Sequence, residues 1–304
     1  MKVNRDACPF FSALASETRL RMVEMLGEGS LNISEMAQRL GVSSTIVAKH
    51  VKTLESANII SCRLLPGEHG QQKICRLVHS GLVLNFMRKT NYPEEMCFEV
   101  PVGSYVDWDV RPTCGLFLQT GALGKSDDAR AFADPRRIEA GCLCVGHGHL
   151  EYAVPNYVGD NKRLVEIRIQ LELCSEAPGY DLNWPSDIYF HINGLCIGCW
   201  TCPSDYGGKP GLYTPDWYAR TFQSQYGELK QIVVNESGSF IDGTRVSDVT
   251  TQRIMAAGYR EFRLRISSPE DTQNPRGFNL FGKRFGNYDQ NILFTVVTAD
   301  SPPA

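Results

Sequence analysis

The hydrophobic periodicity of this chain changes class once, close to residue 90. Over residues 8–87 the apolar side chains recur at the three- and four-residue spacing of amphipathic helices. Beyond residue 93 they alternate with polar residues between frequent Gly, Pro, Asn and Asp, which is typical of strands joined by turns. The chain has 304 residues, enough for two domains. We therefore expect a helix-rich domain over residues 1–90 and an all-β domain over residues 91–304.

Charge follows the same division. Residues 1–90 contain 12 Lys and Arg against 7 Asp and Glu, whereas residues 91–304 contain 19 against 27. A basic domain joined to an acidic one suggests that the first domain meets a polyanion. No apolar run approaches the roughly 20 residues of a membrane span, and the N-terminus lacks the apolar core of a secretory signal. We expect a cytoplasmic protein without membrane contact, whose 11 cysteines stay reduced.

The second half reads as antiparallel β structure. Residues 165–173 carry apolar side chains at odd positions and polar ones at even positions, and residues 261–266 show the same alternation. One face of each strand is therefore core and the other is solvated, as in antiparallel sheets. Shorter alternating runs lie near 98–102, 105–110, 115–120, 229–234 and 292–298. About ten or more strands of this kind predict a sandwich, jelly-roll-like in type.

Capping residues divide the first half into three helices. Ser16, Asn32 and Ser43 each precede a helical apolar run, and Glu35 stands three residues after Asn32, as in a capping box. Glycines end the first two helices, at 27 and 29 and then at 41. The expected inward stripes are Leu20, Val23 and Leu26; Ile33, Met36, Ala37 and Leu40; and Val47, Val51 and Leu54. Two short helices joined by a Gly turn predict a helix-turn-helix.

The third helix leaves small and basic side chains opposite its apolar stripe. Small side chains let a helix enter the major groove of DNA, and lysines reach phosphates and base edges. A solvated helix face would look the same if the lysines stood alone, but the surrounding pattern favours DNA. The predicted contacts of this helix are Ser43, Ser44, Thr45, Ala48, Lys49, His50 and Lys52, with His50 at the border of the stripe.

A basic hairpin follows the third helix. Asn58 stands where a left-handed C-cap is needed, a conformation that Asn tolerates. Strands over residues 59–65 and 73–78 flank a polar turn and carry Arg63, Lys73 and Arg76. Such a wing brings cations to the phosphates beside the recognition helix. Arg63 and Lys73 are therefore predicted to contact DNA.

Two sequence runs and the basic hairpin stand in the order and spacing of one family. The runs are ALASETRLRMVEML and ISEMAQRLGVSSTIVAKHVKTLESANII. Over residues 8–88 the chain resembles the α/β winged helix-turn-helix of the ArsR family of bacterial transcriptional regulators. The resemblance implies a double-stranded DNA operator, repression as the usual outcome, and a homodimer paired through terminal helices, here residues 8–14 and 82–87. Many members bind metal through cysteines in the first helix of the motif, but residues 33–41 contain none.

Asn193-Gly194 is the strongest hairpin signal in the chain. A two-residue turn there would set His191 opposite Cys196, Tyr189 opposite Gly198 and Asp187 opposite Trp200, all on one face. A carboxylate beside aromatic rings suits a sugar, whose C–H faces stack on the rings while its hydroxyls bind the carboxylate. An ordinary aromatic cluster beneath a second layer would produce the same pattern.

Long aromatic and acidic loops, residues 175–187 and 203–218, enter and leave this hairpin, and such loops often carry function. Together with the segment NLFGKRFGNYDQNI, residues 95–297 resemble the C-terminal region of predicted ArsR-like regulators of Gram-positive bacteria, often linked to carbohydrate use. The resemblance implies a small-molecule effector, a carbohydrate first of all. The predicted ligand-binding residues are Trp184, Asp187, Tyr189, His191, Trp200, Tyr213, Asp216 and Trp217.

Cysteines and histidines support a competing hypothesis, a metal or redox sensor, because thiolates and imidazoles bind zinc and copper. Two clusters qualify by spacing: Cys142, Cys144, His147 and His149, and then Cys196, Cys199 and Cys202. In the predicted hairpin, however, Cys196 and Cys199 point to opposite faces and could not share an ion. We expect no bound metal and no cofactor.

An enzyme and a domain that serves only dimerisation are the remaining alternatives. Asp181, Asp187, Asp205 and Asp216 could include a hydrolytic pair. No nucleophile elbow, phosphate loop, dinucleotide fingerprint or HExxH motif occurs. We therefore expect a regulator without catalytic activity, whose β domain senses a small ligand.

Overall fold

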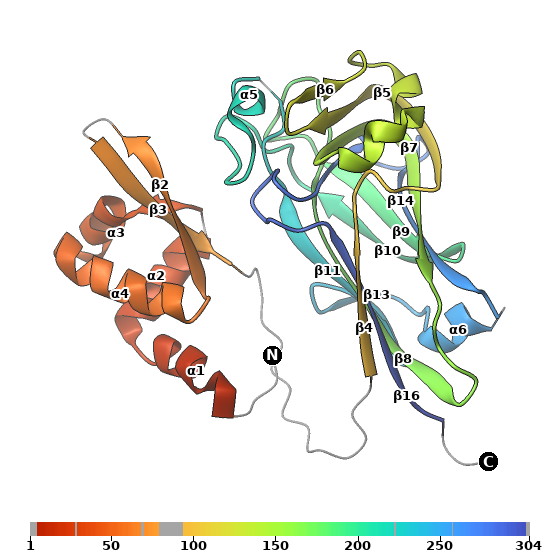
Figure 1. Ribbon diagram of the computed structural model, residues 1–304, viewed down its shortest axis with the longest axis horizontal. Coiled ribbons are helices and arrows are strands. Elements are labelled where there is room, and N and C mark those ends of the chain that lie inside the picture. The colour runs from red at the N-terminus through yellow and green to blue at the C-terminus, as the bar shows by residue number, and fades with distance from the viewer. Residues whose placement is uncertain are drawn as a thin grey trace. The chain divides into compact units, whose positions relative to one another are not determined.

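The computed structural model describes residues 5–27, 29–67, 70–78, 94–221, 223–256 and 258–301. Contacts within the chain divide it into two compact units, Met1–Lys89 and Thr90–Ala304. We call them the head and the β unit (Figure 1). The predicted helix over residues 82–87, residues 89–93 between the two units, and residues 68–69 of the predicted wing turn lie outside the described residues. No helix of the described part is long and apolar enough to cross a membrane.

The head is a winged helix-turn-helix, as predicted. Its apolar core draws on every helix longer than one turn and on all three strands. The strands form an antiparallel sheet in the order β1-β3-β2, and the β2–β3 hairpin is the wing. The elements are η1 Arg5–Ala7, α1 Cys8–Leu14, α2 Glu17–Gly27, β1 Leu31–Asn32, α3 Ile33–Leu40, α4 Ser44–Ser56, β2 Ile60–Gly67 and β3 Gly70–Leu77.

Local signals place the ends of the helices where the sequence predicts them. The Glu35 N–H donates to Asn32 Oδ1 at 2.8 Å, and the Asn32 N–H donates to Glu35 Oε2 at 2.7 Å, which completes the capping box. Gly41 ends α3 with a φ of 69°, and Asn58 adopts a φ of 56° after α4. The left-handed conformation of Gly41 directs the chain into the turn of the motif, and that of Asn58 directs it into the wing.

The predicted stripe of α2 needs a correction at Leu20. That side chain is 46% exposed, whereas Met22 is fully buried together with Leu26. The helix turns its 22–26 edge toward the core, and the residues four apart pack against the rest of the head. Periodicity alone did not distinguish this edge from the one that contains Leu20.

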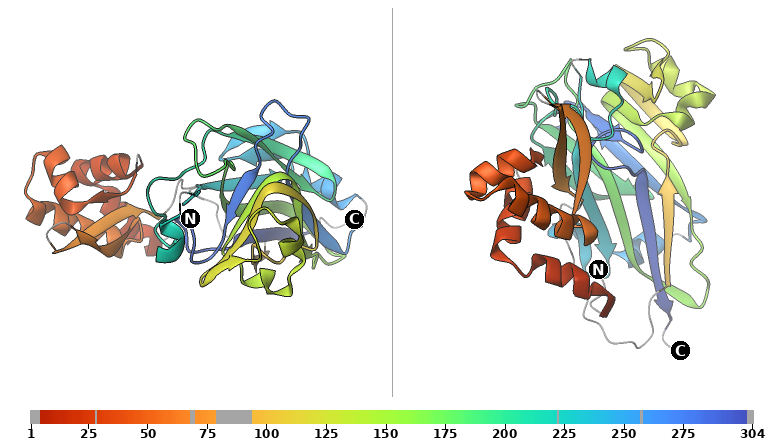
Figure 2. Two further views of the ribbon diagram at one scale, coloured as in Figure 1. Left: turned by 90° about the horizontal axis from the view of Figure 1, so that it is seen from above. Right: turned by 60° about the vertical axis from the view of Figure 1, so that its left-hand side comes forward.

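The β unit is all-β and antiparallel, as predicted, and its strands form a nearly closed sandwich (Figure 2). The strands are β4 Glu94–Val100, β5 Asp107–Leu118, β6 Gly121–Leu123, β7 Cys142–Pro155, β8 Lys162–Cys174, β9 Ser186–Ile192, β10 Leu195–Cys202, β11 Glu228–Asn235, β12 Gly238–Ile241, β13 Thr244–Ser247, β14 Glu261–Ser268, β15 Phe278–Phe281 and β16 Ile292–Asp300. Short helices lie between them: η2 Ala129–Ala133, η3 Pro135–Glu139, α5 Asp216–Ala219 and α6 Thr251–Met255.

Two long strands, β7 and β8, each pair with several neighbours and organise the sandwich into two rows. One row of paired strands runs β10-β9-β14-β7-β5, and a second runs β4-β16-β8-β11-β12-β13. Strand β15 pairs with both β7 and β8 and therefore joins the two rows. The apolar sides of the strands meet between the rows, where the ring centroids of Phe262 from β14 and Phe294 from β16 are 5.7 Å apart.

The alternation in β8 holds with two exceptions. Ile167, Ile169, Leu171 and Leu173 are buried as predicted, but Val165, expected in the core, is only half-buried. Glu172, expected on the solvated side, is only 1% exposed. Its carboxylate accepts backbone N–H bonds from residues 227 and 287 at 2.9 and 2.7 Å and from residue 288 at 2.9 Å. A buried carboxylate is stable there because these donors replace water.

The strands β4 and β16 of the β unit lie side by side. Glu94, where β4 begins, pairs in the β4–β16 ladder with Thr298 near the end of the unit. Lys162 Nζ lies 3.2 Å from Glu94 Oε1 and 2.7 Å from Asp300 Oδ1. One lysine therefore bridges the first and last strands.

Candidate DNA interface and ligand pocket

Helix α4 has an exposed face of small and basic side chains. Ser44, Thr45, Ala48, Lys49 and Lys52 are all exposed, and at 100° per residue they span an arc of about 140°. The helix begins at Ser43, whose Oγ accepts the N–H of residue 46 at 3.4 Å. The opposite side is anchored in the core by residues 47, 51 and 54, all at most 1% exposed. The face therefore takes no part in the core of the head and is available to a partner.

His50 lies at the border between this face and the core. It is half-buried, and burial, followed by the nearby charges of Arg19 and Lys49, lowers its pKa. The neutral imidazole is therefore favoured, which suits packing better than a cationic phosphate contact.

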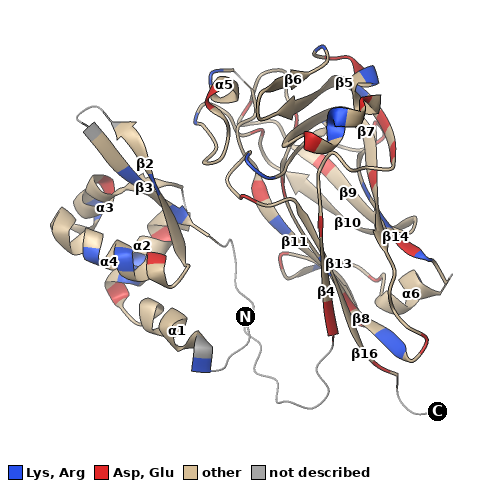
Figure 3. Cartoon of the chain, viewed as in Figure 1, with Lys and Arg blue, Asp and Glu red and all other residues tan. Residues whose placement is uncertain are grey.

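The wing carries the other predicted DNA contacts, and Figure 3 shows the basic residues of the head. Arg63 is exposed on β2. Lys73 on β3 instead lies 2.7 Å from Glu55 Oε2 on α4, and this hydrogen bond raises the pKa of the lysine. Arg76 is buried and donates to Ser61 Oγ at 3.2 Å. Lys73 therefore connects the wing to the recognition helix, a role that spacing alone did not reveal.

The hairpin after Asn193 departs from the predicted register. Residues 195 and 196 pair as expected, but a bulge at residues 197–198 sets Tyr189 opposite Cys199 and Asp187 opposite Thr201. Gly198 allows this because a Cβ there would lie 2.5 Å from Val246 Cγ2 of β13. The expected pairs with Gly198 and Trp200 are therefore wrong.

The bulge changes which side chains share a face. Trp200 lies on the side opposite to Asp187, Tyr189 and His191, and the Lys230 ammonium stands 4.2 Å from its ring centroid. Cys199 now lies on the same side as Cys196, so the argument that they point to opposite faces is also wrong. Even so, no group of three Cys, His, Asp or Glu within the described ranges is arranged to hold a metal ion.

Asp187 is already bonded to protein groups. Its carboxylate accepts the Thr201 hydroxyl at 2.7 Å and the Asn274 backbone N–H at 2.9 Å. Burial raises its pKa, but these bonds outweigh burial and keep the pKa below its ordinary value. The carboxylate thus holds the 269–277 loop on the hairpin.

The predicted loop residues do not gather around the hairpin face. The Trp217 indole N–H donates to the Gln119 carbonyl at 2.8 Å, and Asp216 is exposed at the start of α5. The Tyr213 N–H donates to the carbonyl of residue 286 at 2.9 Å. Trp184 takes part in a different arrangement, a hollow between β5, β7 and two loops.

This hollow, which we call the Glu176 pocket, has a volume of ≈ 220 Å³. It combines a carboxyl group, an imidazole, a guanidinium, an indole, a hydroxyl and three prolines. Its lining residues are Pro112, Thr113, Gly146, His147, Glu176, Pro178, Trp184, Pro275 and Arg276. Of these, only Trp184 belongs to the predicted ligand-binding set, because the others converge from four segments far apart in the sequence.

Glu176 is the most unusual group of the pocket. It is 8% exposed, and its Oε1 accepts the Thr113 hydroxyl at 2.9 Å. Burial, and then the negative charge of Asp205, raise the pKa of its carboxyl to about 8. Burial likewise raises the pKa of Asp205 to about 7. At neutral pH Glu176 is therefore mostly protonated and can donate a hydrogen bond from its carboxyl group.

The other polar groups of the pocket are held by short contacts. The Trp184 indole N–H donates to the Glu176 carbonyl at 2.6 Å, and the Arg276 guanidinium carbon lies 4.2 Å from the indole ring centroid. The cation–π contact and the hydrogen bond fix the indole in place. His147 Nδ1 is buried and has no hydrogen-bond partner in the structure. A ligand atom in the pocket could supply one.

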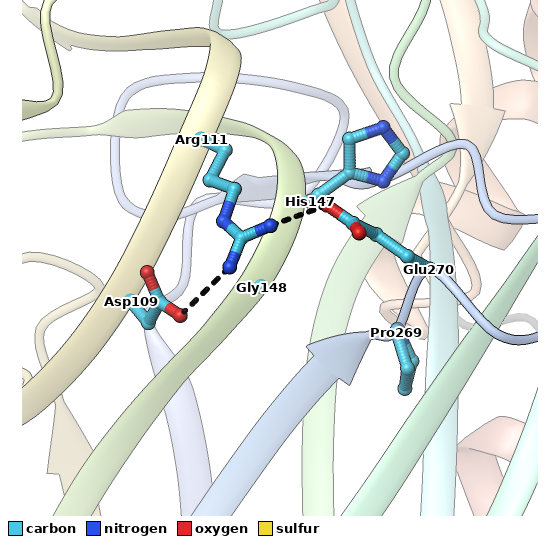
Figure 4. Close-up of a pocket in the computed structure, with 6 residues that line it drawn as sticks. All are labelled: Asp109, Arg111, His147, Gly148, Pro269 and Glu270. Atoms are coloured by element: carbon cyan, nitrogen blue, oxygen red, sulfur yellow. Dashed lines mark hydrogen bonds and ion pairs between the residues drawn. The ribbon is translucent and has the colours of Figure 1, made fainter.

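His147 also lines a second hollow of ≈ 210 Å³ (Figure 4). There Arg111 lies 2.6 Å from Glu270 Oε1 and 3.9 Å from Asp109 Oδ2, and all three side chains are more than half exposed. These charges neutralise one another in solvent. The Glu176 pocket is the better candidate because its carboxyl group is buried and mostly protonated at neutral pH.

The following comparisons with known proteins concern the head. Residues 14–63 match the family model described as a helix-turn-helix domain. The HTH-type transcriptional regulator Rv2034 of Mycobacterium tuberculosis is 35% identical over 82 residues, which are 27% of this chain and 73% of that protein. Two solved structures are also similar. HlyU from Vibrio cholerae shows 27% identity over 23% of this chain and 73% of its own, with a TM-score of 0.21. The homodimeric winged helix-turn-helix domain Mb0332 from Mycobacterium bovis is 23% identical. The match covers 25% of this chain and 64% of the Mb0332 domain, with a TM-score of 0.21.

Proposed function

Because the chain belongs to the HTH-type transcriptional regulators, we propose that it is a homodimeric repressor of the ArsR type whose β unit senses a small ligand. The exposed face of α4 carries the DNA half of this proposal. The ligand half is supported by the Glu176 pocket. The proposal assigns no catalytic activity to the β unit.

Reading of the operator follows from the chemistry of the α4 face. Thr45 and Ser44 stand near the start of the helix, where side chains of a recognition helix meet base edges. Lys49 and Lys52 lie farther along and reach phosphates, as does Arg63 from the wing. In a homodimer the two half-sites lie about one helical turn apart, roughly 34 Å, or a multiple of it.

The DNA half is tested by the salt dependence of binding to a duplex selected from a random pool with the full chain. Lys49→Ala and Lys52→Ala should each weaken binding and reduce the magnitude of the slope of log K against log salt by about 2, because each removes one phosphate contact from each protomer of the dimer. Thr45→Ala should change the preferred sequence instead. Arg21→Ala, which removes an exposed charge from α2, is the matched control. Unchanged binding by a Lys49→Ala, Lys52→Ala, Arg63→Ala triple variant would contradict this assignment.

A small polyhydroxylated ligand, a sugar first of all, fits the groups of the Glu176 pocket. Protonated Glu176 and the Arg276 guanidinium donate hydrogen bonds, which hydroxyl oxygens accept. A hydroxyl can in turn donate to His147 Nδ1, which has no partner. The volume is below the roughly 300 Å³ at which pockets for drug-sized molecules begin, so the ligand is small.

Quenching of tryptophan fluorescence by a panel of mono- and oligosaccharides tests the ligand half. Trp184→Phe and His147→Ala should abolish or weaken the response to the sugar that binds the wild-type chain. Trp217→Phe is the matched control, because it removes an indole that bonds to Gln119 and does not line the pocket. A response that Trp184→Phe and His147→Ala keep in full would place the ligand elsewhere. No response to any sugar would contradict the carbohydrate assignment.

Regulation requires more than binding. The sugar must favour one state of the regulator over the other, because equal affinity for both states shifts nothing. Affinity for the selected duplex should therefore change at saturating sugar, and the Trp184→Phe variant should lose this change while it still binds DNA. Equal DNA affinity with and without a bound sugar would remove the sensor role.

A further inference from the structure

Two thiols face each other inside the wing. Cys62 on β2 and Cys75 on β3 are direct partners in the antiparallel ladder, and their sulfur atoms are 3.2 Å apart. Direct partners in such a ladder have Cα atoms about 4.5 or 5.5 Å apart, within the roughly 4.4–6.8 Å that a disulfide spans. The spacing of the two strands at this pair therefore permits a disulfide.

We propose that Cys62 and Cys75 form a modification site, at which hydrogen peroxide produces a wing disulfide that weakens DNA binding and that small thiols reverse. The site is separate from the ligand pocket. Only its effect on DNA rests on the proposed function.

The surroundings favour reaction at this pair. Cys62 is partly exposed, so peroxide can reach it, whereas Cys75 is fully buried. The Cys62 thiol donates a hydrogen bond to Cys75 Sγ, which lowers the pKa of Cys75 and raises that of Cys62. Lys73 beside the pair also lowers the pKa of Cys75. Within the pair, the hydrogen bond therefore eases loss of the Cys75 proton, and the 3.2 Å contact gives a direct path for a proton between the two sulfurs.

The reaction balances without a further component. Cys62 first passes its proton to Cys75 along the hydrogen bond between them, which makes Cys62 the thiolate. The Cys62 sulfur then attacks one peroxide oxygen, the O–O bond breaks, the released hydroxide takes up a proton and leaves as water, and Cys62 becomes a sulfenic acid. The Cys75 sulfur then attacks the Cys62 sulfur, the S–O bond breaks, and a second water leaves. Two thiols are oxidised by two electrons, and one hydrogen peroxide is reduced to two waters.

A disulfide would move the outer strand of the wing. Cys75 is held in the middle of the head sheet, since it pairs with Leu31 on one side and Cys62 on the other. The sulfurs must approach from 3.2 Å to about 2.05 Å, so Cys62 and its neighbour Arg63 absorb most of the change. Loss of the Arg63 phosphate contact, a hydrogen bond between charged groups, should weaken DNA binding by about tenfold.

Peptide mapping of the full chain tests the disulfide itself. The reduced chain is treated with hydrogen peroxide, blocked with an alkylating reagent and digested with trypsin. Residues 53–63 and 74–76 then form separate peptides with one cysteine each, so the disulfide appears as a cross-linked pair of defined mass. The pair should form, disappear with dithiothreitol and be absent from Cys62→Ser. Cys196→Ser, which removes an exposed thiol of the β unit, is the matched control and should still form it.

DNA binding by the same samples tests the consequence. The oxidised wild-type chain should bind the selected duplex about tenfold more weakly than the reduced chain, and dithiothreitol should restore the affinity. Cys62→Ser should bind equally with and without peroxide. Absence of the cross-linked peptide while Cys196 becomes oxidised would overturn the modification site. A cross-linked wing with unchanged DNA affinity would overturn its regulatory role, and the proposed ligand sensing would stand in either case.

Discussion

Replacing Glu176 with Gln should stabilise the β unit at alkaline pH and have little effect in acid. The folded chain holds this carboxyl away from water, which raises its pKa from 4.5 to about 8. Gln keeps the shape and can still accept the Thr113 hydroxyl, but it never ionises. The substitution therefore removes only the free energy needed to keep the carboxyl protonated, or to bury it charged.

The sign and size of the change in the free energy of unfolding follow from proton linkage. Between pH 4.5 and about 8 the unfolded chain has lost this proton while the folded chain retains it. Folding then takes up a proton, so the free energy of unfolding of the wild-type unit falls by about 1.4 kcal/mol per pH unit. Across the whole interval the loss approaches about 5 kcal/mol, an upper value because Asp205 titrates nearby. The Gln variant avoids this loss.

Urea unfolding followed by tryptophan fluorescence measures the effect on the correct unit, since all four tryptophans of the chain lie beyond residue 107. The difference between variant and wild type should be small near about pH 5 and several kcal/mol near about pH 9. Glu139→Gln, at an exposed carboxylate, controls for the loss of a surface charge. A variant that is no more stable than wild type at alkaline pH would refute the reasoning about Glu176.

Three further outcomes are expected. Asn32→Ala removes the capping box of α3 and should cost the head about 1 kcal/mol, measured by thermal unfolding with circular dichroism. Glu172→Gln weakens the acceptor of three backbone N–H bonds and should destabilise the β unit by about 2 kcal/mol in urea unfolding. Lys73→Ala should lower the salt slope of DNA binding less than Lys52→Ala, because the Lys73 charge already faces Glu55. Equal slopes for the two lysine variants would show that Lys73 contacts phosphate.

Features that depend only on neighbours in sequence were predictable in both units. The Asn32 capping box and the left-handed Asn58 each rest on the chemistry of a few consecutive residues. The alternation that separates core from solvent in β14 is equally local, and the structure confirms it. Leu20 shows the limit of this approach, because the choice between two edges of α2 depends on the elements packed against it.

The ligand pocket could not be predicted from the sequence, because its residues meet through contacts between distant segments of the chain. The bulge at Gly198 forms against Val246, almost 50 residues away, and it moved Trp200 off the predicted face. Glu176 is buried against Thr113 and Asp205, which come from other segments of the chain. The aromatic loop that bears Trp184 is recognisable in the sequence, but no local pattern marks the Glu176 carboxyl group as part of a pocket.

The pairing of β4 with β16 makes the β unit a transferable module. Its first and last strands are neighbours, and Lys162 joins Glu94 to Asp300 across them. A unit whose two ends meet can be inserted into, or detached from, another chain without stretching its own backbone. A recombination event that exchanged only the head would therefore leave the architecture of the β unit intact. The same sandwich could then be joined to heads that recognise different operator sequences.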